Sequence, residues 1–130
     1  MPVAWFEVTG KSGQRLRTFY GDLFGWKAAD VAPGADYGVT EAASRGIGGG
    51  LGADPTGNGG HLTFFVEVPD FEAALREVER LGGKRVGNPT AFPDKRPSSK
   101  GRGKVAFAYF TDPEGHLVGL CQGIIRRKAI

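Results

Sequence analysis

The chain has 130 residues, and its 17 Lys and Arg against 14 Asp and Glu give a formal charge of +3. This length suits one domain, which can bury roughly two-thirds of its unfolded surface without a disulfide or metal. A hydrophobic content of 40% argues against disorder, and no apolar run approaches the roughly 18–20 residues of a membrane span. The N-terminus lacks the apolar core of a secretory signal, and the single Cys121 cannot form an internal disulfide. We therefore expect a cytoplasmic protein with no membrane partner.

The first half opens with a predicted strand at residues 3–8, followed by a predicted helix. Apolar residues recur at helical spacing in that helix and form one stripe: Leu16, Phe19, Tyr20, Leu23 and Phe24. Ser12 precedes the stripe and is the expected N-cap. Two weaker strands, at residues 37–43 and 46–51, complete this half.

The second half repeats this order, with a predicted strand at residues 61–68 and a second helix. The apolar residues of this helix also share one face: Phe71, Ala74, Leu75, Val78 and Leu81. Asp70 is its expected N-cap, and Gly82 suits a left-handed position at its end. Strands at 104–111 and 116–122 form a hairpin whose turn, residues 112–115, has Pro second and Gly fourth, as a type I turn prefers.

The two halves therefore repeat each other, and we predict one α+β domain built from two similar modules. Module one spans about 1–54, a Gly-rich linker about 55–60, module two about 61–124 and a basic tail 125–130. Each sheet would place one face on its helix and leave the other face free. Two such faces curved together would enclose a cleft.

Positive charge is concentrated near the C-terminus. Residues 1–94 hold 9 basic and 12 acidic side chains, whereas residues 95–130 hold 8 basic and 2 acidic ones. A loop at 95–104 and the tail carry this excess, which could attract phosphate or nucleic acid. Aromatic residues do not alternate with these basic residues, as a platform for single-stranded nucleic acid requires. We therefore expect no nucleic-acid partner.

Three segments resemble the vicinal oxygen chelate superfamily, which includes glyoxalase I, bleomycin-resistance proteins and extradiol dioxygenases. They are FYGDLFGW at residues 19–26, GHLTFFVEV at 60–68 and FTDPEGH at 110–116. The resemblance spans almost the whole chain. It implies a pair of βαβββ modules, a curved mixed sheet around a cleft, helices on the outer face, and a homodimer.

Enzymes of this superfamily commonly hold one divalent metal with His and Glu ligands on four strands. The resemblance places those ligands at Trp5, in the run Gly48–Gly50, at His61 and at Gly119. Only His61 is a ligand residue, and Glu7 could add a second one. A catalytic ion normally needs about three protein ligands, so we expect no metal and no other cofactor.

Strand alternation predicts which side chains face the cleft. If His61 does, Thr63, Phe65 and Glu67 share its face, while Leu62, Phe64, Val66 and Val68 face the helix. Glycines at 48–50 and 119 would leave volume for a ligand. The candidate ligand-binding residues are Trp5, Thr63, Phe65, Phe107, Tyr109, Gly49, Gly119 and Cys121.

Glu7 and His61 are the candidate catalytic residues. An inward carboxylate is costly unless it is paired, and a Glu7–His61 pair would favour the charged imidazole. The pair could transfer a proton as acid and base, or it could be purely structural.

We therefore expect a glyoxalase/bleomycin-resistance-like protein that binds a neutral or anionic organic molecule without a metal. If it is an enzyme, a lyase or isomerase reaction would use Glu7 and His61. One alternative is a metal-dependent lyase, isomerase or dioxygenase with Glu41 or Glu67 as third ligand. A more remote one is a nucleic-acid-associated protein that uses Lys95–Lys104 and the tail.

Overall fold

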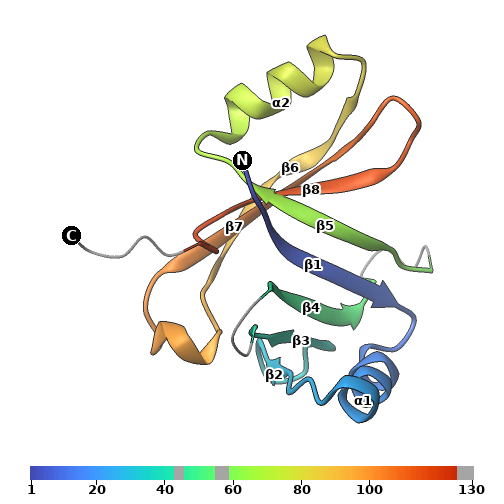
Figure 1. Ribbon diagram of the computed structural model, residues 1–130, viewed down its shortest axis with the longest axis vertical. Coiled ribbons are helices and arrows are strands. Elements are labelled where there is room, and N and C mark those ends of the chain that lie inside the picture. Colours follow the sequence, from blue (N-terminus) through green and yellow to red (C-terminus); the bar gives the residue numbers. More distant parts are fainter. Residues whose placement is uncertain (43–45, 55–58, 126–130) are drawn as a thin grey trace.

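The computed structural model describes residues 1–42, 46–54 and 59–125. Two helices and eight strands follow one another along the chain (Figure 1). In chain order they are β1 (Val3–Gly10), α1 (Gly13–Phe24), β2 (Ala29–Asp30), β3 (Tyr37–Thr40), β4 (Gly48–Ala53), β5 (Leu62–Glu67), α2 (Phe71–Arg80), β6 (Lys84–Pro93), β7 (Lys104–Thr111) and β8 (Leu117–Gln122), with a 3-10 turn at Pro97–Ser99. Residue 43, most of the predicted linker and the basic tail from residue 126 lie outside the described residues.

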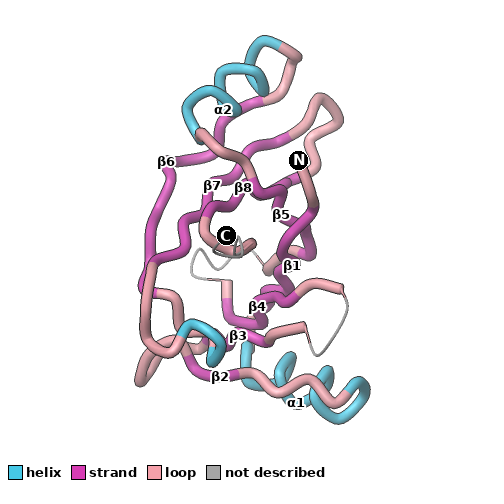
Figure 2. Tube along the Cα trace, turned by 60° about the vertical axis from the view of Figure 1, so that its left-hand side comes forward, coloured by secondary structure: helices cyan, strands magenta, loops and turns pink. Residues whose placement is uncertain are grey.

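All eight strands form one sheet in the order β2-β3-β4-β1-β5-β8-β7-β6. Each half is a βαβββ unit, with β1 parallel to β4 and β5 parallel to β8. The halves join through the antiparallel pair β1–β5, and the sheet curls around its inner face (Figure 2). The α+β half-barrel predicted from the sequence is thus confirmed.

The glycine at the start of α1 allows this helix to lie close to the sheet. A side chain at Gly13 would collide with Asp36 and with the backbone of β4 at Gly52. Ser12 caps α1 by accepting from the Arg15 N–H at 3.1 Å, and Gly25 ends it with φ of 74°. Only part of the predicted apolar stripe is covered, because Phe19, Leu23 and Phe24 are exposed.

The second helix covers its half of the sheet at β6 and β7. Asp70 accepts from the Ala73 N–H at 3.1 Å, and Leu75 is fully buried. The prediction that Leu62 and Phe64 face a helix is wrong, because α2 does not reach them: 75% of Leu62 and 46% of Phe64 are exposed. Neither helix among the described residues has the length and apolar composition to cross a membrane.

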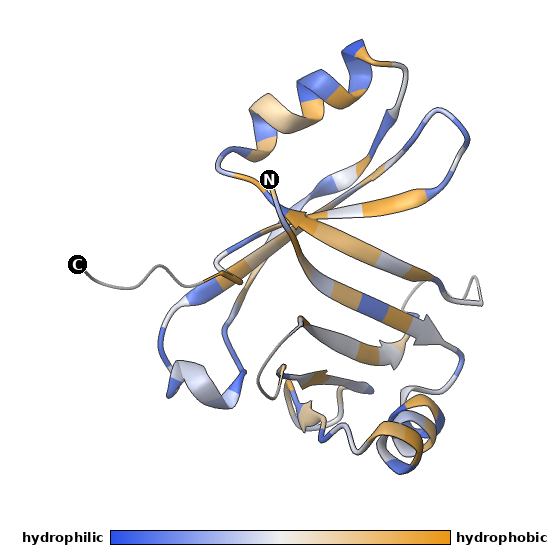
Figure 3. Cartoon of the chain, viewed as in Figure 1, coloured by the Kyte–Doolittle hydropathy of each residue, from blue (hydrophilic) through white to orange (hydrophobic). Residues whose placement is uncertain are grey.

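Aromatic side chains fill the inner face of the half-barrel. The central buried cluster includes Trp5, Phe65, Val105 and Cys121, with Phe107 and Tyr109 packed against it. Hydrophobic residues are concentrated along β5 and β8, near the middle of the sheet (Figure 3). The inner face is thus a packed core along much of its length.

Candidate functional site

Three side chains from β1, β3 and β7 and one from the residue before β5 converge on the inner face, and we call them the Glu7 cluster: Glu7, Tyr37, His61 and Tyr109. Glu7 Oε2 accepts from the Tyr37 hydroxyl at 2.5 Å, and Oε1 accepts from the Tyr109 hydroxyl at 2.6 Å. His61 Nε2 lies 2.5 Å from Glu7 Oε1. Three donors therefore compensate a carboxylate whose residue is only 7% exposed.

The strand register explains why these groups meet. Glu7 pairs with Thr63 across β1–β5, and His61 precedes β5 two residues before Thr63. The backbones of Thr9 and His61 exchange hydrogen bonds, and the Thr9 hydroxyl accepts from the His61 N–H at 3.0 Å. His61 Nδ1 lies 3.4 Å from that hydroxyl. Both ring nitrogens of His61 thus have polar neighbours.

The environment of the cluster shifts three pKa values upward. The hydrogen bond to Glu7 raises the pKa of His61, with burial opposing it. Burial, reinforced by the Glu7 charge, raises the pKa of the Tyr37 and Tyr109 hydroxyls, so both remain protonated donors. The Trp5 indole N–H lies close enough to the Tyr37 hydroxyl to oppose the rise in its pKa. This N–H has no hydrogen-bond partner of acceptable geometry among the described residues.

The cluster can exchange a proton with solvent through His61. The His61 side chain is 24% exposed, whereas that of Glu7 is 10% exposed. A carboxylate and an imidazole 2.5 Å apart form an acid–base pair. The structure therefore brings together the two residues that the sequence nominated for proton transfer.

Tyr37 belongs to this cluster and was not among the predicted site residues. The signal lies in β4, where Gly50 and Gly52 alternate beside β3. A side chain at either glycine would overlap the Tyr37 ring. Glycines at alternate positions of a strand indicate close approach of a neighbouring group, and here that group is a tyrosine.

Glycines of the inner face do not leave the ligand volume that we expected. A side chain at Gly119 would overlap the Phe65 ring, and one at Gly48 would meet the Thr40 backbone and the Trp5 ring. The prediction that Gly49 lines the cleft is wrong. Gly49 pairs with Phe6, whose side chain faces the outside, and that ring covers it.

The other predicted ligand-binding residues lie on the inner face as core or structural groups. Thr63 donates to the Leu117 carbonyl at 2.6 Å, and Phe65 packs edge-on against Phe107 and Tyr109. Cys121 is fully buried. Burial, with the nearby Glu67 charge, raises the pKa of its thiol to about 12.

A second feature opens at the other end of β1, and we call it the Trp5 pocket. Its volume is about 460 Å³. Apolar side chains and the basic loop together line it: Val3, Ala4, Trp5, Glu41, Ala42, Gly46, Ile47, Gly48, Arg96, Ser98, Ile124 and Ile125. Of the predicted ligand-binding residues, Trp5 is the one that lines this opening.

Two charged residues hold one wall of the Trp5 pocket in place. Arg96 pairs with Asp94 at 2.8 Å and donates to the carbonyls of Gly123 and Ile124. Glu67 accepts from the N–H groups of Gly123, Ile124 and Ile125 at 3.1–3.2 Å. The turn carrying both isoleucines is thus fixed from two sides.

Among the described residues, Glu7 and His61 have no third ligand residue beside them for a catalytic divalent metal. Glu41 accepts from the Ser98 N–H and hydroxyl, and Glu67 is occupied as described above, so neither joins Glu7 and His61. Across residues 1–42, 46–54 and 59–125, no three His, Cys, Asp or Glu side chains converge as a ligand set. The metal-dependent alternative with Glu41 or Glu67 as third ligand is therefore wrong in its geometry.

Comparisons with solved structures show the same architecture. A glyoxalase/bleomycin resistance protein/dioxygenase superfamily member from Vibrio splendidus 12B01 is 17% identical, with a TM-score of 0.60, over 93% of this chain and 97% of that one. A hypothetical protein from Bacillus halodurans C-125 is 16% identical, with a TM-score of 0.59, over 98% of both chains. Methylmalonyl-CoA epimerase from Mycobacterium tuberculosis is 14% identical, with a TM-score of 0.60, over 92% of this chain and 86% of the epimerase.

The sequence itself gives a more specific assignment. No curated protein matches it. A family model described as a glyoxalase-like domain matches residues 7–121, which is most of the chain and parts of both βαβββ units. This chain therefore belongs to the glyoxalase-like domain family.

Proposed function

We propose that this protein binds a small neutral or anionic organic molecule in the Trp5 pocket, without a resident metal. The observation that carries the proposal is the pocket itself: an opening of about 460 Å³ with an indole, isoleucine side chains and a few polar groups. Such a mixture is typical of small-molecule sites.

The charges around the pocket favour the proposed ligand class. Glu41 is already hydrogen-bonded to Ser98, so its carboxylate is a poor partner for a cation. Arg96 lies at the wall, where Asp94 balances its charge, and Lys95 and Lys100 belong to the same loop. The two lysines attract an anionic substituent more readily than a cationic one.

Trp5 provides a direct reporter of binding. The Trp26→Phe variant keeps an aromatic ring beside Phe6 and leaves Trp5 as the sole indole. We would titrate it with phenylacetate, phenylacetamide, phenethylamine and methylmalonyl-CoA. The CoA ester is included because one solved relative by fold is methylmalonyl-CoA epimerase in complex with it. We expect fluorescence changes with anionic or neutral probes and none with the amine.

Ile47→Asp tests whether the signal comes from this pocket. Ile47 is a half-exposed wall residue, so its carboxylate replacement would repel an anionic probe and lose its water to a neutral one; binding should weaken about tenfold or more. Val86→Asp is the matched control, because Val86 is a half-exposed residue that does not line the pocket. Binding of the amine alone, or equal loss in both variants, would contradict the proposal.

Metal independence needs its own measurement. Metal content of protein purified without chelator or affinity tag, and thermal shift with added Ni, Zn, Mn, Fe(II) and Co, would provide it. We expect far less than one ion per chain and no shift. Near-stoichiometric metal would contradict this part of the proposal.

A second candidate is a proton-transfer reaction of the lyase or isomerase class at the Glu7 cluster. The 2.5 Å contact between His61 and Glu7 favours it specifically. Exchange of the α-hydrogen of methylmalonyl-CoA in deuterated water would detect such chemistry. We expect His61→Gln to abolish exchange, whereas His116→Gln, which changes the exposed histidine, should preserve it. Exchange that survives His61→Gln would exclude the pair.

A further inference from the structure

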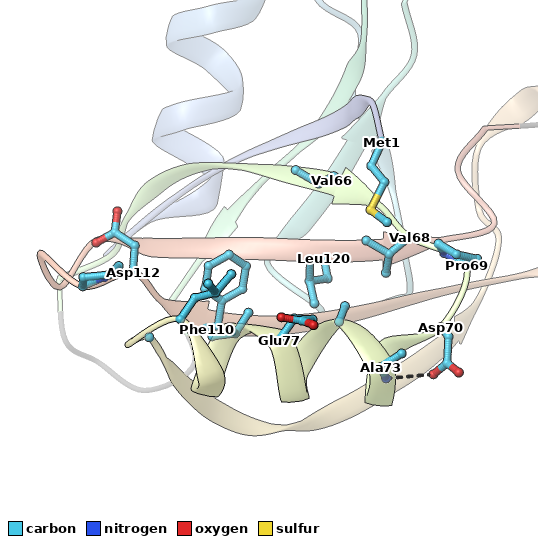
Figure 4. Close-up of a pocket in the computed structure, with 15 residues that line it drawn as sticks. Met1, Val66, Val68, Pro69, Asp70, Ala73, Glu77, Phe110, Asp112 and Leu120 are labelled. Carbon is cyan, nitrogen blue, oxygen red and sulfur yellow. Dashed lines mark hydrogen bonds between the residues drawn. The ribbon is translucent and has the colours of Figure 1, made fainter.

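An apolar crevice runs along α2 on the outer side of the sheet, and we call it the α2 crevice (Figure 4). Its volume is about 510 Å³, and small-molecule sites span roughly 300–1,000 Å³. Outward side chains of β5, β7 and β8, one side of the helix and the neighbouring turns line it: Met1, Val66, Val68, Pro69, Asp70, Ala73, Ala74, Glu77, Val78, Leu81, Gly83, Phe110, Asp112, Pro113 and Leu120. The residues that line the Trp5 pocket are all different ones, so the crevice is a separate cavity.

The crevice is open because α2 does not cover the outer face of β5. The helix packs mainly over β6 and β7, and its Leu75 is fully buried in the core cluster beneath it. The side of the helix that lines the crevice presents Ala73 and Ala74, whose short side chains leave the half-buried Val66 accessible. An apolar floor therefore stays within reach of a ligand.

The side-chain charges around the crevice have one sign. Its described lining residues include Asp70, Glu77 and Asp112 and no Lys, Arg or His. Asp70 and Asp112 lie at the two ends, with Glu77 between them (Figure 4). The loop beside the Trp5 pocket carries Lys95 and Lys100 instead. An acidic rim around an apolar floor favours a ligand that joins a positive charge to an apolar body.

Glu77 is the carboxylate best placed to contact such a ligand. Asp70 caps α2, and Asp112 accepts from two backbone N–H groups of its own turn. Glu77 instead pairs with Arg80 at 2.7 Å, and the two side chains are 58% and 67% exposed. Pairs between exposed side chains contribute little to stability, so Glu77 can turn from Arg80 to a cation in the crevice.

We propose that the α2 crevice binds a small hydrophobic organic cation, such as an alkylammonium ion. The apolar part of the ligand lies on the floor formed by Val66, Val68 and Leu120, and its positive group lies beside Glu77. Release of water from the floor drives binding, and the carboxylates select the charge. The Glu7 cluster is on the opposite face of the sheet and the Trp5 pocket shares no residue with the crevice, so this site does not depend on the proposed function.

Isothermal titration of the whole chain with octylammonium chloride tests the site. We expect one octylammonium ion per chain. Glu77→Gln should raise its dissociation constant about threefold or more, because the ammonium group loses its nearest carboxylate. Glu72→Gln is the matched control, since Glu72 is on the same helix but pairs with Arg85 at 2.9 Å and does not line the crevice. No binding, or an equal effect of the two variants, would overturn the proposal.

Ala73→Arg tests whether the ion occupies the crevice. The longer side chain fills part of the space and adds a positive charge, and Ala73 is exposed on the helix, so the fold should tolerate the change. We expect octylammonium to bind about tenfold more weakly. Ala91→Arg is the control, because Ala91 is an exposed residue of β6 that does not line the crevice. Equal affinities in the two variants would place the ion elsewhere and overturn the proposal.

Titration with sodium octanoate separates this site from the Trp5 pocket, because this probe has the same alkyl chain and the opposite charge. Ile47→Asp should weaken octanoate binding and leave octylammonium binding unchanged, whereas Ala73→Arg should weaken only octylammonium binding. A changed octylammonium affinity in Ile47→Asp would place the cation in the Trp5 pocket and overturn the proposal. If the probes of the Trp5 pocket fail to bind while octylammonium still binds, the proposed function fails and the crevice site stands.

Discussion

Replacing Tyr109 by Phe removes one hydroxyl from the Glu7 cluster and leaves the ring in place. The ring centroid lies 5.4 Å from that of Phe65 and 5.8 Å from that of His61, so packing is preserved and no cavity forms. The change therefore isolates the 2.6 Å hydrogen bond from the hydroxyl to Glu7 Oε1.

The expected magnitude follows from the type of bond. A hydrogen bond to a charged group contributes about 1.5–3 kcal/mol. Glu7 keeps two other donors in the variant, Tyr37 and His61, so it is not left unpaired. We expect the lower half of that range, about 1.5–2 kcal/mol, and a fall in Tm of roughly 5–8 °C for a chain of this size.

Equilibrium unfolding in urea, followed by tryptophan fluorescence, measures this loss. The slope of the free energy with denaturant should not change, since the surface exposed on unfolding stays the same. Tyr20→Phe is the control, because the Tyr20 hydroxyl makes no hydrogen bond to any described residue. If Tyr109→Phe lowers the free energy of unfolding no more than Tyr20→Phe does, the hydrogen bond from Tyr109 to Glu7 does not stabilise the fold.

Two further predictions concern the same inner face. The raised pKa of His61 means that its charged pair with Glu7 stabilises the fold fully below about pH 6.5 and loses this effect as pH rises through the folded-state value. The stability gap between the natural chain and His61→Gln, measured by urea unfolding, should therefore shrink from pH 6 to pH 9. Gly119→Ala should destabilise the fold by about 1–3 kcal/mol, because its methyl group would overlap the immobile ring of Phe65.

Each of these predictions has a matched comparison. His116→Gln is the comparison for losing an imidazole away from Glu7, because His116 is largely exposed and pairs with Asp112 instead. A gap between natural chain and His61→Gln that grows with pH would reverse the sign argued above. For the glycine, Gly10→Ala places its methyl group at an ordinary 3.4 Å from Leu16 Cδ1. Equal losses of stability in Gly10→Ala and Gly119→Ala would show that the Phe65 ring moves aside to accommodate the new methyl group.

Short sequence patterns correctly predicted the helices and strands around the site. Ser12 and Asp70 were expected to cap the helices, and both side chains accept a backbone N–H three residues on. The strand at 61–68 and the hairpin after Lys104 were also expected, and each follows a short pattern of apolar residues and turn residues. Such features depend on neighbours in sequence, so one chain is enough to detect them.

The strand β6 was not predicted, because its sequence lacks alternation. Gly87 and Pro89 lie inside it, at the point where its register with β7 shifts between Val86 and Thr90. The strand is at the edge of the sheet, and most of its residues are exposed. An edge strand tolerates proline and bulges and carries no buried face, so its hydrophobic pattern is weak.

The Glu7 cluster was only half predictable. Strand alternation placed Glu7 and His61 on one face. Tyr37 is on β3, however, and its side chain extends across β4, which lies between β1 and β3, to contact Glu7. That contact depends on the order of strands in the sheet rather than on spacing along the chain. The expected empty volume failed for a related reason: the glycines mark where rings from other strands lie.

The ring of Phe65 over Gly119 also has an evolutionary consequence. Position 119 is where the resemblance to metal-dependent relatives places a carboxylate ligand, and here a bulky neighbour fills that space. A carboxylate here would require a change at 119 and a smaller residue at 65 together. Either step alone is costly, the first by steric overlap and the second by a cavity of about a phenyl ring. A carboxylate at this position is therefore reachable only through two coupled substitutions, each of which destabilises the fold when made alone.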